Sequence, residues 1–227
     1  MNNRRLEEIL QYEFNNKELL QYALNHGSYC VEHGLSHEQS NQRLEFLGDA
    51  YFDAIISTEL YRRMHSDEGK LSRTRAAIVC ENSLASVAER LGIGNFLNLG
   101  KGEDNAGGRH KKSLQADAVE AIVGAIFLDG GYEAAERFVL REFDDIITEA
   151  LTGNLVLDYK TKVQEEFQKK GKKIRISYEL DKTTGPDHDK TFFVHLTCNG
   201  KKYGSGIGKT KKEAEQQAAK ATMEGGI

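Results

Sequence analysis

Tryptophan is absent from the 227 residues, and the sequence has only one proline and three cysteines. Cys30, Cys80 and Cys198 are far apart and show neither a metal-binding spacing nor a disulfide framework, so we expect a reducing environment. The longest apolar run, residues 118–128, is interrupted by Glu120 and is too short to span a membrane. The N-terminal segment lacks the apolar stretch of a secretory signal. Together these absences predict a cytoplasmic protein that is not bound to a membrane.

Charge is distributed unevenly along the chain, although the net charge is only −4. Residues 157–227 contain 15 Lys and Arg against 10 Asp and Glu, a balance of +5, whereas the remainder contains 16 against 25, a balance of −9. The basic part can attract phosphate groups, and the acidic part can hold a cation. The 39% apolar content and the scarcity of proline favour a helix-rich protein with a hydrophobic core.

Residues 41–52, NQRLEFLGDAYF, combine helical spacing of apolar residues with two acids. Glu45 and Asp49 are four residues apart, about one helical turn, so both point from the same face. Apolar neighbours make these carboxylates unfavourable unless a cation or a hydrogen-bond donor satisfies them. Gly48 lies between them and lets another backbone or an ion approach closely.

A second apolar stretch, residues 114–128, repeats this design with Asp117 and Glu120 on one helical face and Gly124 beside them. An acid pair on one helix is usually part of its solvated face. Two such pairs among apolar residues favour crossing helices that bring four carboxylates together. Their mutual repulsion would be relieved by a divalent metal, and oxygen ligands favour Mg²⁺ or Mn²⁺ over zinc.

Three blocks of sequence carry a resemblance to a known family. Residues 42–50, QRLEFLGDA, resemble the signature of the ribonuclease III family, whose members are double-stranded RNA endonucleases. Residues 67–76 and 107–129 are similar to that family's two other motif blocks, in the same order. The C-terminal part resembles a double-stranded RNA-binding domain, so the resemblance extends over the whole chain.

The predicted fold has two domains of different class. We expect an all-α endonuclease domain over residues 1–153, a short linker over 154–156 and an α+β double-stranded RNA-binding domain over 157–227. In the last range, apolar alternation predicts three strands between two helices, and this α-β-β-β-α order is that of the RNA-binding domain.

The resemblance implies roles for the acids of the first domain. Glu45, Asp117 and Glu120 would be metal ligands, with Glu120 also catalytic because it would bridge both metal-dependent roles. Asp49 would be catalytic by holding a metal-bound water or the leaving-group side. Glu68 matches an auxiliary family acid near the active site. The implied cofactor is Mg²⁺, with Mn²⁺ able to substitute, and no organic cofactor is expected.

The resemblance also implies a product and an assembly. Cleavage of double-stranded RNA would give 5′-phosphate and 3′-hydroxyl ends with a short 3′ overhang, in the processing of ribosomal and other structured RNA precursors. The active form would be a homodimer with one site for each strand, and Phe46 would lie at the dimer contact. Gln42 departs from the family pattern, which usually has Glu at this position.

Three elements of the second domain are similar to the family's RNA contacts: one helical face, one loop and the start of the last helix. The helical face and the loop would touch two successive minor grooves, and the lysines would touch phosphates across the major groove between them. These residues are Thr161, Gln164, Glu165, His188, Lys209, Lys211 and Lys212. The alternative for the lysines is an ordinary solvated face.

Other features of the first domain have more than one interpretation. His26 is interpreted as a hydrogen-bonded structural histidine, because no nucleophile accompanies it. Arg73 and Arg75 could contact phosphate or form a solvated face. The glycine-rich residues 92–108 are expected to form a loop over the site. Two rival functions, a protein that binds RNA without cutting it and a metal phosphohydrolase for small nucleotides, fit the sequence less well, because all four acids and the RNA-binding domain are present.

Overall fold

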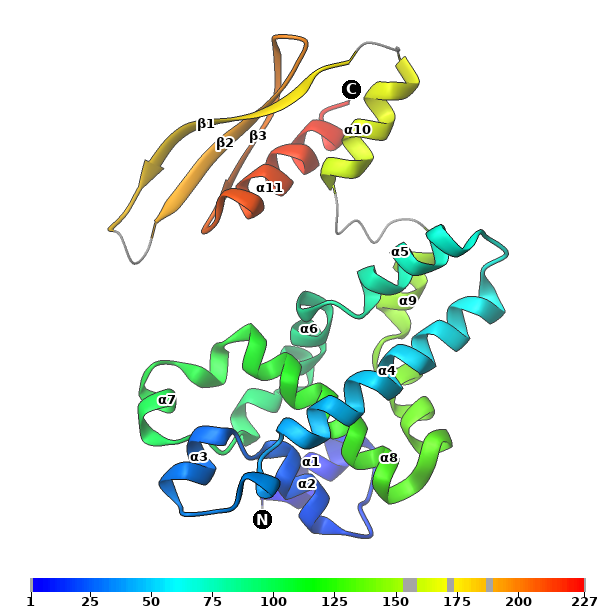
Figure 1. Ribbon diagram of the computed structural model, residues 1–227, viewed down its shortest axis with the longest axis vertical. Helices are drawn as coiled ribbons and strands as arrows, with labels where there is room; N and C mark the ends of the chain where they lie inside the picture. The colour runs from blue at the N-terminus through cyan, green and yellow to red at the C-terminus, as the bar shows by residue number, and fades with distance from the viewer. Residues whose placement is uncertain (1, 153–158, 171–173, 187–189, 227) are drawn as a thin grey trace. The chain divides into compact units, whose positions relative to one another are not determined.

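The computed structural model describes residues 2–152, 159–170, 174–186 and 190–226. The chain forms two compact units, Met1–Leu155 and Val156–Ile227 (Figure 1). The linker predicted at residues 154–156 lies outside the described residues. Within the part of the chain that is described, no helix is both long and apolar enough to cross a membrane.

The first unit is built from helices, which confirms the all-α prediction. Three short 3₁₀ turns, η1 to η3, lie between the helices. The elements are α1 (Asn2–Leu10), α2 (Lys17–Leu24), α3 (Gly27–Glu32), η1 (His37–Gln39), α4 (Gln42–Arg63), α5 (Glu68–Ile78), α6 (Glu81–Leu91), η2 (Ile93–Phe96), α7 (Lys101–Asn105), η3 (Gly108–His110), α8 (Lys112–Glu142) and α9 (Asp144–Leu151).

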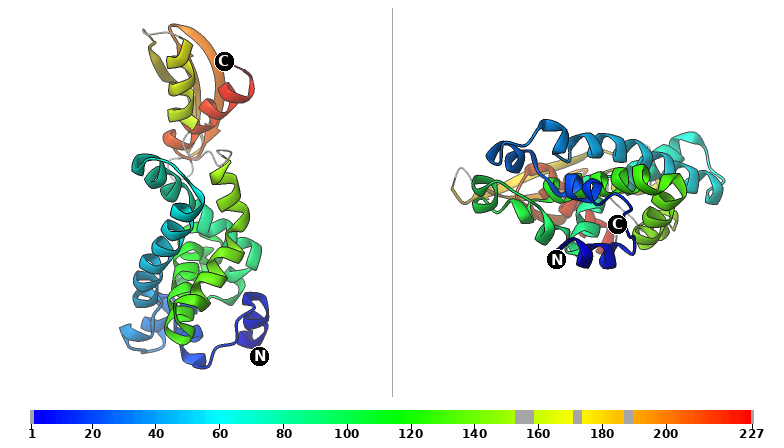
Figure 2. Two further views of the ribbon diagram at one scale, coloured as in Figure 1. Left: turned by 90° about the vertical axis from the view of Figure 1, so that its right-hand side faces the viewer. Right: turned by 90° about the horizontal axis from the view of Figure 1, so that it is seen from below.

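Helices α4 and α8 lie side by side, and two glycines bring their backbones into contact (Figures 1 and 2). A Cβ atom added to Gly48 on α4 would lie 1.8 Å from the Glu120 carbonyl oxygen on α8. A Cβ atom on Gly124 of α8 would lie 2.3 Å from the Leu44 carbonyl oxygen on α4. No side chain fits at either position, so the close approach of the two helices depends on these glycines.

The hydrophobic core of the first unit holds this pair of helices in place. Helix α4 buries Phe52, Ile55 and Ile56, and α8 buries Ile122 and Ile126, all with at most 1% of their surface exposed. Full burial of one such side chain stabilises the fold by about 1.5–3 kcal/mol. The apolar stretches that surround the predicted acid pairs are therefore the central core of the unit.

Asn25 fixes the beginning of α4 relative to the segment that follows α6. Its side chain donates to the Gln39 carbonyl at 3.0 Å and accepts from the Asn98 side-chain amide at 2.8 Å. Its carbonyl accepts from the backbone N–H of Asn41 at 2.8 Å. Asn25 is almost fully buried, and these bonds satisfy polar groups that would otherwise be costly to bury.

The glycine-rich residues 92–108 form η2, α7 and the start of η3, so the prediction of a plain loop was wrong. Arg109 holds this segment together. Its guanidinium donates twice to the Asp104 carboxylate, at 2.8 and 2.9 Å, and once to the Leu97 carbonyl at 2.8 Å. Charge-assisted bonds of this kind order a segment whose glycine content alone gives no helical signal.

The second unit has the predicted α-β-β-β-α order. Its elements are α10 (Tyr159–Lys170), β1 (Ile176–Thr184), β2 (Thr191–Cys198), β3 (Lys201–Gly208) and α11 (Lys211–Glu224). The strands form an antiparallel sheet in the order β1-β2-β3. Asn199 and Gly200, with φ of 51° and 81°, form the predicted tight turn between β2 and β3, which requires left-handed backbone at both positions.

Alternate glycines on β3 let α11 pack directly on the sheet. A Cβ atom on Gly206 would lie 2.2 Å from the Ala214 carbonyl oxygen, and one on Gly204 would lie 2.4 Å from the Thr222 backbone nitrogen. The alanine-rich character of α11 matches this contact, since Ala218 is fully buried. Glycines therefore allow the close approach of β3 and α11, as they do for α4 and α8.

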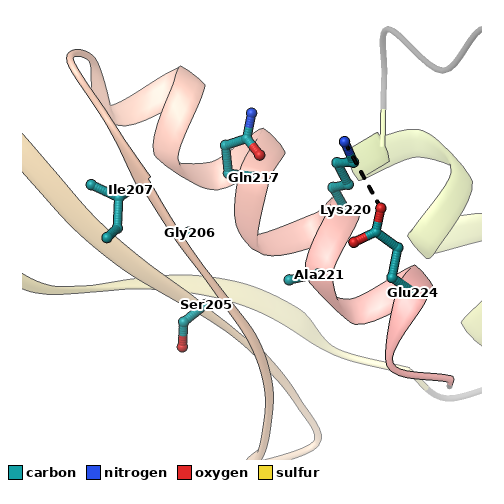
Figure 3. A pocket seen from close by; sticks show the side chains of 7 residues that line it. All are labelled: Ser205, Gly206, Ile207, Gln217, Lys220, Ala221 and Glu224. Carbon is teal, nitrogen blue, oxygen red and sulfur yellow. Dashed lines mark ion pairs between the residues drawn. The ribbon is translucent and has the colours of Figure 1, made fainter.

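A shallow pocket of about 330 Å³ opens beside this contact (Figure 3). Lys220 and Glu224, one turn apart on α11, form an ion pair of 3.8 Å at its edge. The lining residues are Ser205, Gly206, Ile207, Gln217, Lys220, Ala221 and Glu224. Among these lining residues the one carboxylate is that of Glu224, and it is already paired with Lys220. The pocket therefore has no group of acids that could act together in catalysis.

We predict that Gly48→Ala destabilises the protein. The new methyl group has no space against the α8 backbone, and overpacking of this kind lowers the free energy of unfolding by about 1–3 kcal/mol. Urea-induced unfolding followed by circular dichroism measures the change.

Gly102→Ala is the matched control, because Gly102 is also helical but has nothing within 4 Å of an added Cβ atom. This control is expected to leave the free energy of unfolding unchanged or to raise it by less than about 1 kcal/mol. Equal stability of the two variants would contradict the role of Gly48.

Candidate active site

Helices α4 and α8 bring three of the four predicted acids together. Carboxylate oxygens of Glu45 on α4 and of Asp117 and Glu120 on α8 all lie within 4.8 Å of one another. All three side chains are half-buried. Gly48 lies directly against the Glu120 backbone, so the contact between the helices places the Glu45 and Glu120 carboxylates on one shared face.

The electrostatics of this group are unfavourable when all its members are ionised. Burial raises the pKa of Glu120 to about 8, and the negative charges of Asp49, Glu45, Asp117 and Asp53 contribute to that rise. Burial is also the main cause of the raised pKa of Glu45 and of Asp117. Carboxylates that disfavour one another's charged forms gain most from a cation between them.

The three acids fit a divalent cation by their chemistry as well as their charge. They offer only oxygen ligands, which hard cations such as Mg²⁺ and Mn²⁺ prefer. Their ligand atoms are close enough to reach one ion together. The partial exposure of each side chain leaves room for water and for a substrate oxygen. We call Glu45, Asp117 and Glu120 the three-acid group.

Asp49 lies beside the three-acid group and is not one of its members. Its side chain is exposed, one turn further along α4 than Glu45. Its charge nevertheless raises the pKa of both Glu120 and Glu45, so it lies within electrostatic reach of the group. Asp49 is therefore more exposed than the three-acid group, and its role at a metal-bound water or on the leaving-group side stays a prediction.

Within one chain, the structure does not bring Glu68 to the other acids. Glu68 begins α5, beyond the C-terminal end of α4, whereas Glu45 lies in the first turn of α4. The rise of an α-helix places these two ends of α4 about 27 Å apart. The Glu68 carboxylate accepts a hydrogen bond from Ser72 at 2.8 Å. Within one chain Glu68 is therefore remote from the three-acid group, and its auxiliary role stays a prediction.

The structure distinguishes the two arginines that the sequence left open. Arg73 is exposed, whereas Arg75 is half-buried and donates to the Ser57 hydroxyl on α4 at 3.1 Å. The Ser57 hydroxyl in turn donates to the backbone carbonyl of Asp53 at 2.6 Å. Asp53 was not among the residues predicted from sequence. The available signal was its spacing, since Asp53 follows Asp49 by four residues on the same helix.

His26 caps a helix, which confirms its structural interpretation. Its Nδ1 accepts from the Ser28 backbone N–H at 3.2 Å at the start of α3. The Ser28 hydroxyl also accepts from the Gly100 backbone N–H at 3.0 Å, which joins α3 to the segment before α7. His26 is close enough to Asp117 for its positive form to lower the pKa of that carboxyl.

Two residues near the start of α4 face solvent. Phe46 follows Glu45 and has 80% of its surface exposed, which is unusual for a large aromatic side chain. Gln42, the first residue of α4, is also exposed and does not belong to the three-acid group. The place of Phe46 at a dimer contact stays a prediction.

The second unit presents the predicted RNA-binding residues on α10 and at the start of α11. Gln164 and Glu165 are exposed on α10. Lys211 and Lys212 are exposed in the first turn of α11, and Lys209 precedes it. His188 and the side chain of Thr161 lie outside the described residues.

The N-terminus of α11 combines lysines with a capped helix end. Thr210 is the N-cap and accepts from the Glu213 backbone N–H at 3.1 Å. The Glu213 carboxylate accepts from the Lys209 backbone N–H at 2.8 Å. A helix N-terminus with exposed lysines in its first turn is favourable for phosphate.

Comparison with protein families assigns both units. Residues 16–147 match the model of the Ribonuclease-III-like family, and residues 159–224 match the double-stranded RNA binding motif. The first match contains the three-acid group, and the second contains the exposed residues of α10 and α11.

Known proteins resemble the chain over almost its entire length. Ribonuclease 3 from Caldanaerobacter subterraneus subsp. tengcongensis is 48% identical over 217 residues, 94% of this chain and 93% of that protein. Ribonuclease 3 from Clostridium perfringens is 42% identical over 220 residues, 96% of this chain and 92% of that protein. The solved nuclease domain of ribonuclease III from Campylobacter jejuni superimposes with a TM-score of 0.58 at 42% identity, over 62% of this chain and 95% of that one. The chain therefore belongs to the ribonuclease III family and is an endoribonuclease that carries a double-stranded RNA-binding domain.

Proposed function

We propose that this protein cleaves double-stranded RNA with Mg²⁺ as its cofactor, and that Mn²⁺ can replace Mg²⁺. The observation that carries the proposal is the convergence of Glu45, Asp117 and Glu120, whose ligand oxygens lie within 4.8 Å of one another. The raised pKa of Glu120, to about 8, supports it, because such a group is stabilised by a cation. The RNA-binding motif in the same chain supports a duplex as the substrate.

The four acids divide two tasks in the proposed mechanism. Glu45, Asp117 and Glu120 hold the cation, which when bound would polarise the scissile phosphate and lower the pKa of a water molecule. Asp49, which is exposed beside the group, would orient a water molecule at the cation or act on the leaving-group side. Water attacks the phosphorus in line with the 3′ oxygen. The new P–O bond forms as the P–O3′ bond breaks, the water gives up a proton to solvent and the leaving 3′ oxygen takes one from solvent, so the products carry 5′-phosphate and 3′-hydroxyl ends. No side-chain nucleophile takes part.

The second unit supplies affinity for the duplex. Gln164 and Glu165, with Thr161, would contact hydroxyls in one minor groove, and His188 would enter the next. The lysines at the start of α11 would contact the phosphates between these grooves. The first unit contains most of the chain's acidic residues, so attraction to the RNA backbone depends on the basic residues of the second.

A homodimer completes the proposed enzyme. Phe46 is exposed beside Glu45 and would pack against the partner subunit. The Campylobacter jejuni nuclease domain has structural flexibility in a region involved in its dimer formation, which supports a dimer here as well. Two copies would place one site at each strand and leave a short 3′ overhang, and Glu68 would act near the site of the other copy. The expected substrates are ribosomal and other structured RNA precursors in the cytoplasm.

We predict that Glu120→Gln abolishes cleavage and leaves duplex binding within a few-fold of the wild type. The rate should fall by more than about a hundredfold, because the loss of a residue that only supports a metal ligand already costs up to about a hundredfold. Cleavage of a long RNA duplex in Mg²⁺ measures the rate, and a gel-shift assay without divalent cations measures binding.

Glu89→Gln makes the same chemical change at an exposed position on α6 and serves as its control. Cleavage by Glu120→Gln at a rate close to that of the control would show that the three-acid group is not the active site.

A second prediction concerns pH. Because the pKa of Glu120 is raised to about 8, this carboxyl is mostly protonated at neutral pH when no cation is bound. The cation must displace that proton, so lower pH favours the proton and higher pH favours the cation. Affinity for Mn²⁺ should rise by up to about tenfold per pH unit below the pKa and level off above it. Calorimetric titrations between about pH 6 and pH 9 test this. Constant affinity over that range would contradict the raised pKa.

A third prediction concerns the lysines of α11. The double variant Lys211→Ala, Lys212→Ala should bind duplex RNA more weakly, and by a similar factor for duplexes of different sequence. It should also reduce the slope of log affinity against log salt by about two, because each lost phosphate contact releases about one counterion fewer. Binding measured without divalent cations over a salt series gives the slope.

Lys201→Ala with Lys202→Ala is the matched control for this measurement. These lysines begin β3, and α11 follows the opposite end of that strand. The control removes the same charge from the same unit and should leave the slope nearly unchanged. Equal slopes for the two double variants would mean that only the total charge matters, and the assignment of α11 would be wrong.

A further inference from the structure

The acids of α4 continue beyond the residues assigned to the site. Glu45, Asp49 and Asp53 follow one another at intervals of four residues, so they form a row that winds slowly around the helix. Asp53 is half-buried, and its Oδ1 atom is buried with no hydrogen-bond partner among the described residues. Its charge contributes to the raised pKa of Glu120, so the row reaches the three-acid group electrostatically.

An arginine from another helix lies at the C-terminal end of this row. Arg75 comes from α5 and is anchored on α4 by the Ser57 hydroxyl, one turn beyond Asp53. That hydroxyl is fixed by its bond to the Asp53 backbone carbonyl. Burial raises the pKa of Asp53, and the charge of Arg75 offsets part of that rise, although the two side chains form no direct ion pair in the described residues. Asp53 therefore has a cation beside it but keeps one oxygen unsatisfied.

We propose that Asp53 and Arg75 are positioning residues that set, with opposite signs, how tightly the three-acid group holds a divalent cation. The inference rests on the proposed function, in which that group binds the cation. Asp53 adds negative charge along the row and strengthens binding, and Arg75 offsets part of that charge and weakens it.

Distance determines the size of the expected effect. Asp53 is eight residues after Glu45, which corresponds to about 12 Å along the helix axis. At this separation, in a half-buried site, one unit charge acts on a divalent ion strongly enough to change its affinity by about threefold to tenfold. This change is smaller than the loss expected from removal of a direct ligand, and it is large enough to measure.

The opposite signs separate this proposal from a structural role. If Asp53 and Arg75 only joined α5 to α4, the loss of either would disturb the site and weaken cation binding. If they act through charge, removal of Asp53 weakens binding, removal of Arg75 tightens it, and removal of both nearly restores the original affinity.

Mn²⁺ binding to the full-length protein without RNA tests the proposal, with free Mn²⁺ measured by electron paramagnetic resonance. Asp53→Asn should weaken binding by about threefold or more, and Arg75→Gln should tighten it by a smaller factor, because Arg75 contacts Ser57 one turn further from the three-acid group. Gln keeps a donor for the Ser57 hydroxyl and removes the charge. The double variant should return to within about twofold of the wild type.

Two further variants keep the result interpretable. Arg75→Lys keeps the charge and should bind Mn²⁺ like the wild type, even if the Ser57 bond is altered. Arg73→Gln removes an exposed charge two residues earlier on α5 and should have a smaller effect than Arg75→Gln. Thermal unfolding followed by circular dichroism confirms that each variant is folded.

The possible outcomes distinguish this inference from the proposed function. Weaker binding in both single variants, or no change in either, would overturn the charge role of Asp53 and Arg75. If the folded Arg75→Lys variant bound Mn²⁺ more weakly than the wild type, the charge role would also be overturned, because this variant keeps the positive charge. Failure of the wild type to bind Mn²⁺ more tightly than Glu120→Gln would instead overturn the proposed metal site itself.

Discussion

The contact between the backbones of α4 and α8 is the constraint on which the rest of the first unit depends. Gly48 and Gly124 are the residues that allow it, since a side chain at either position would overlap the opposite helix. Because the helices are this close, Glu45 and Glu120 come within reach of the same ion. Burial at this contact, together with the charges of the neighbouring acids, raises the pKa of Glu120 to about 8, so ionisation of the whole group is unfavourable without a cation. The large apolar residues on either side of the acids stabilise the crossing against that repulsion.

Much of this arrangement could be predicted from sequence because it is local. Helical spacing in residues 41–52 and 114–128 identified both acid pairs, and an apolar setting distinguished them from a solvated face. The Asn199–Gly200 turn and the strand alternation around it predicted the α-β-β-β-α order of the second unit, which the structure confirms. In each case the signal lies within one or two helical turns or one hairpin, where residue spacing alone determines which side chains share a face.

What could not be predicted depends on contacts between distant segments. The short helices within residues 92–108 form because Arg109 reaches back to Asp104 and to a backbone carbonyl, and glycine content gives no sign of that. Arg75 differs from Arg73 in its contact with Ser57, which lies on another helix. The distance of Glu68 from the other acids follows from the length of α4, and its predicted role near the site remains a prediction for the assembled protein.

The distribution of charge between the two units has a functional consequence. A site that must concentrate carboxylates to hold a cation repels the phosphate backbone that it has to cut. In this chain the basic residues are concentrated in the other unit, where Lys211 and Lys212 extend from a helix N-terminus that itself favours anions. Cation binding and RNA binding are thus complementary steps. In the proposed mechanism the cation would neutralise the acids at the point of cleavage, and the lysines would hold the duplex by contacts that salt weakens. The proposed effect of Asp53 and Arg75 belongs to the first step alone, because their charges act on the cation and are far weaker than the combined attraction of the RNA-binding residues for phosphate.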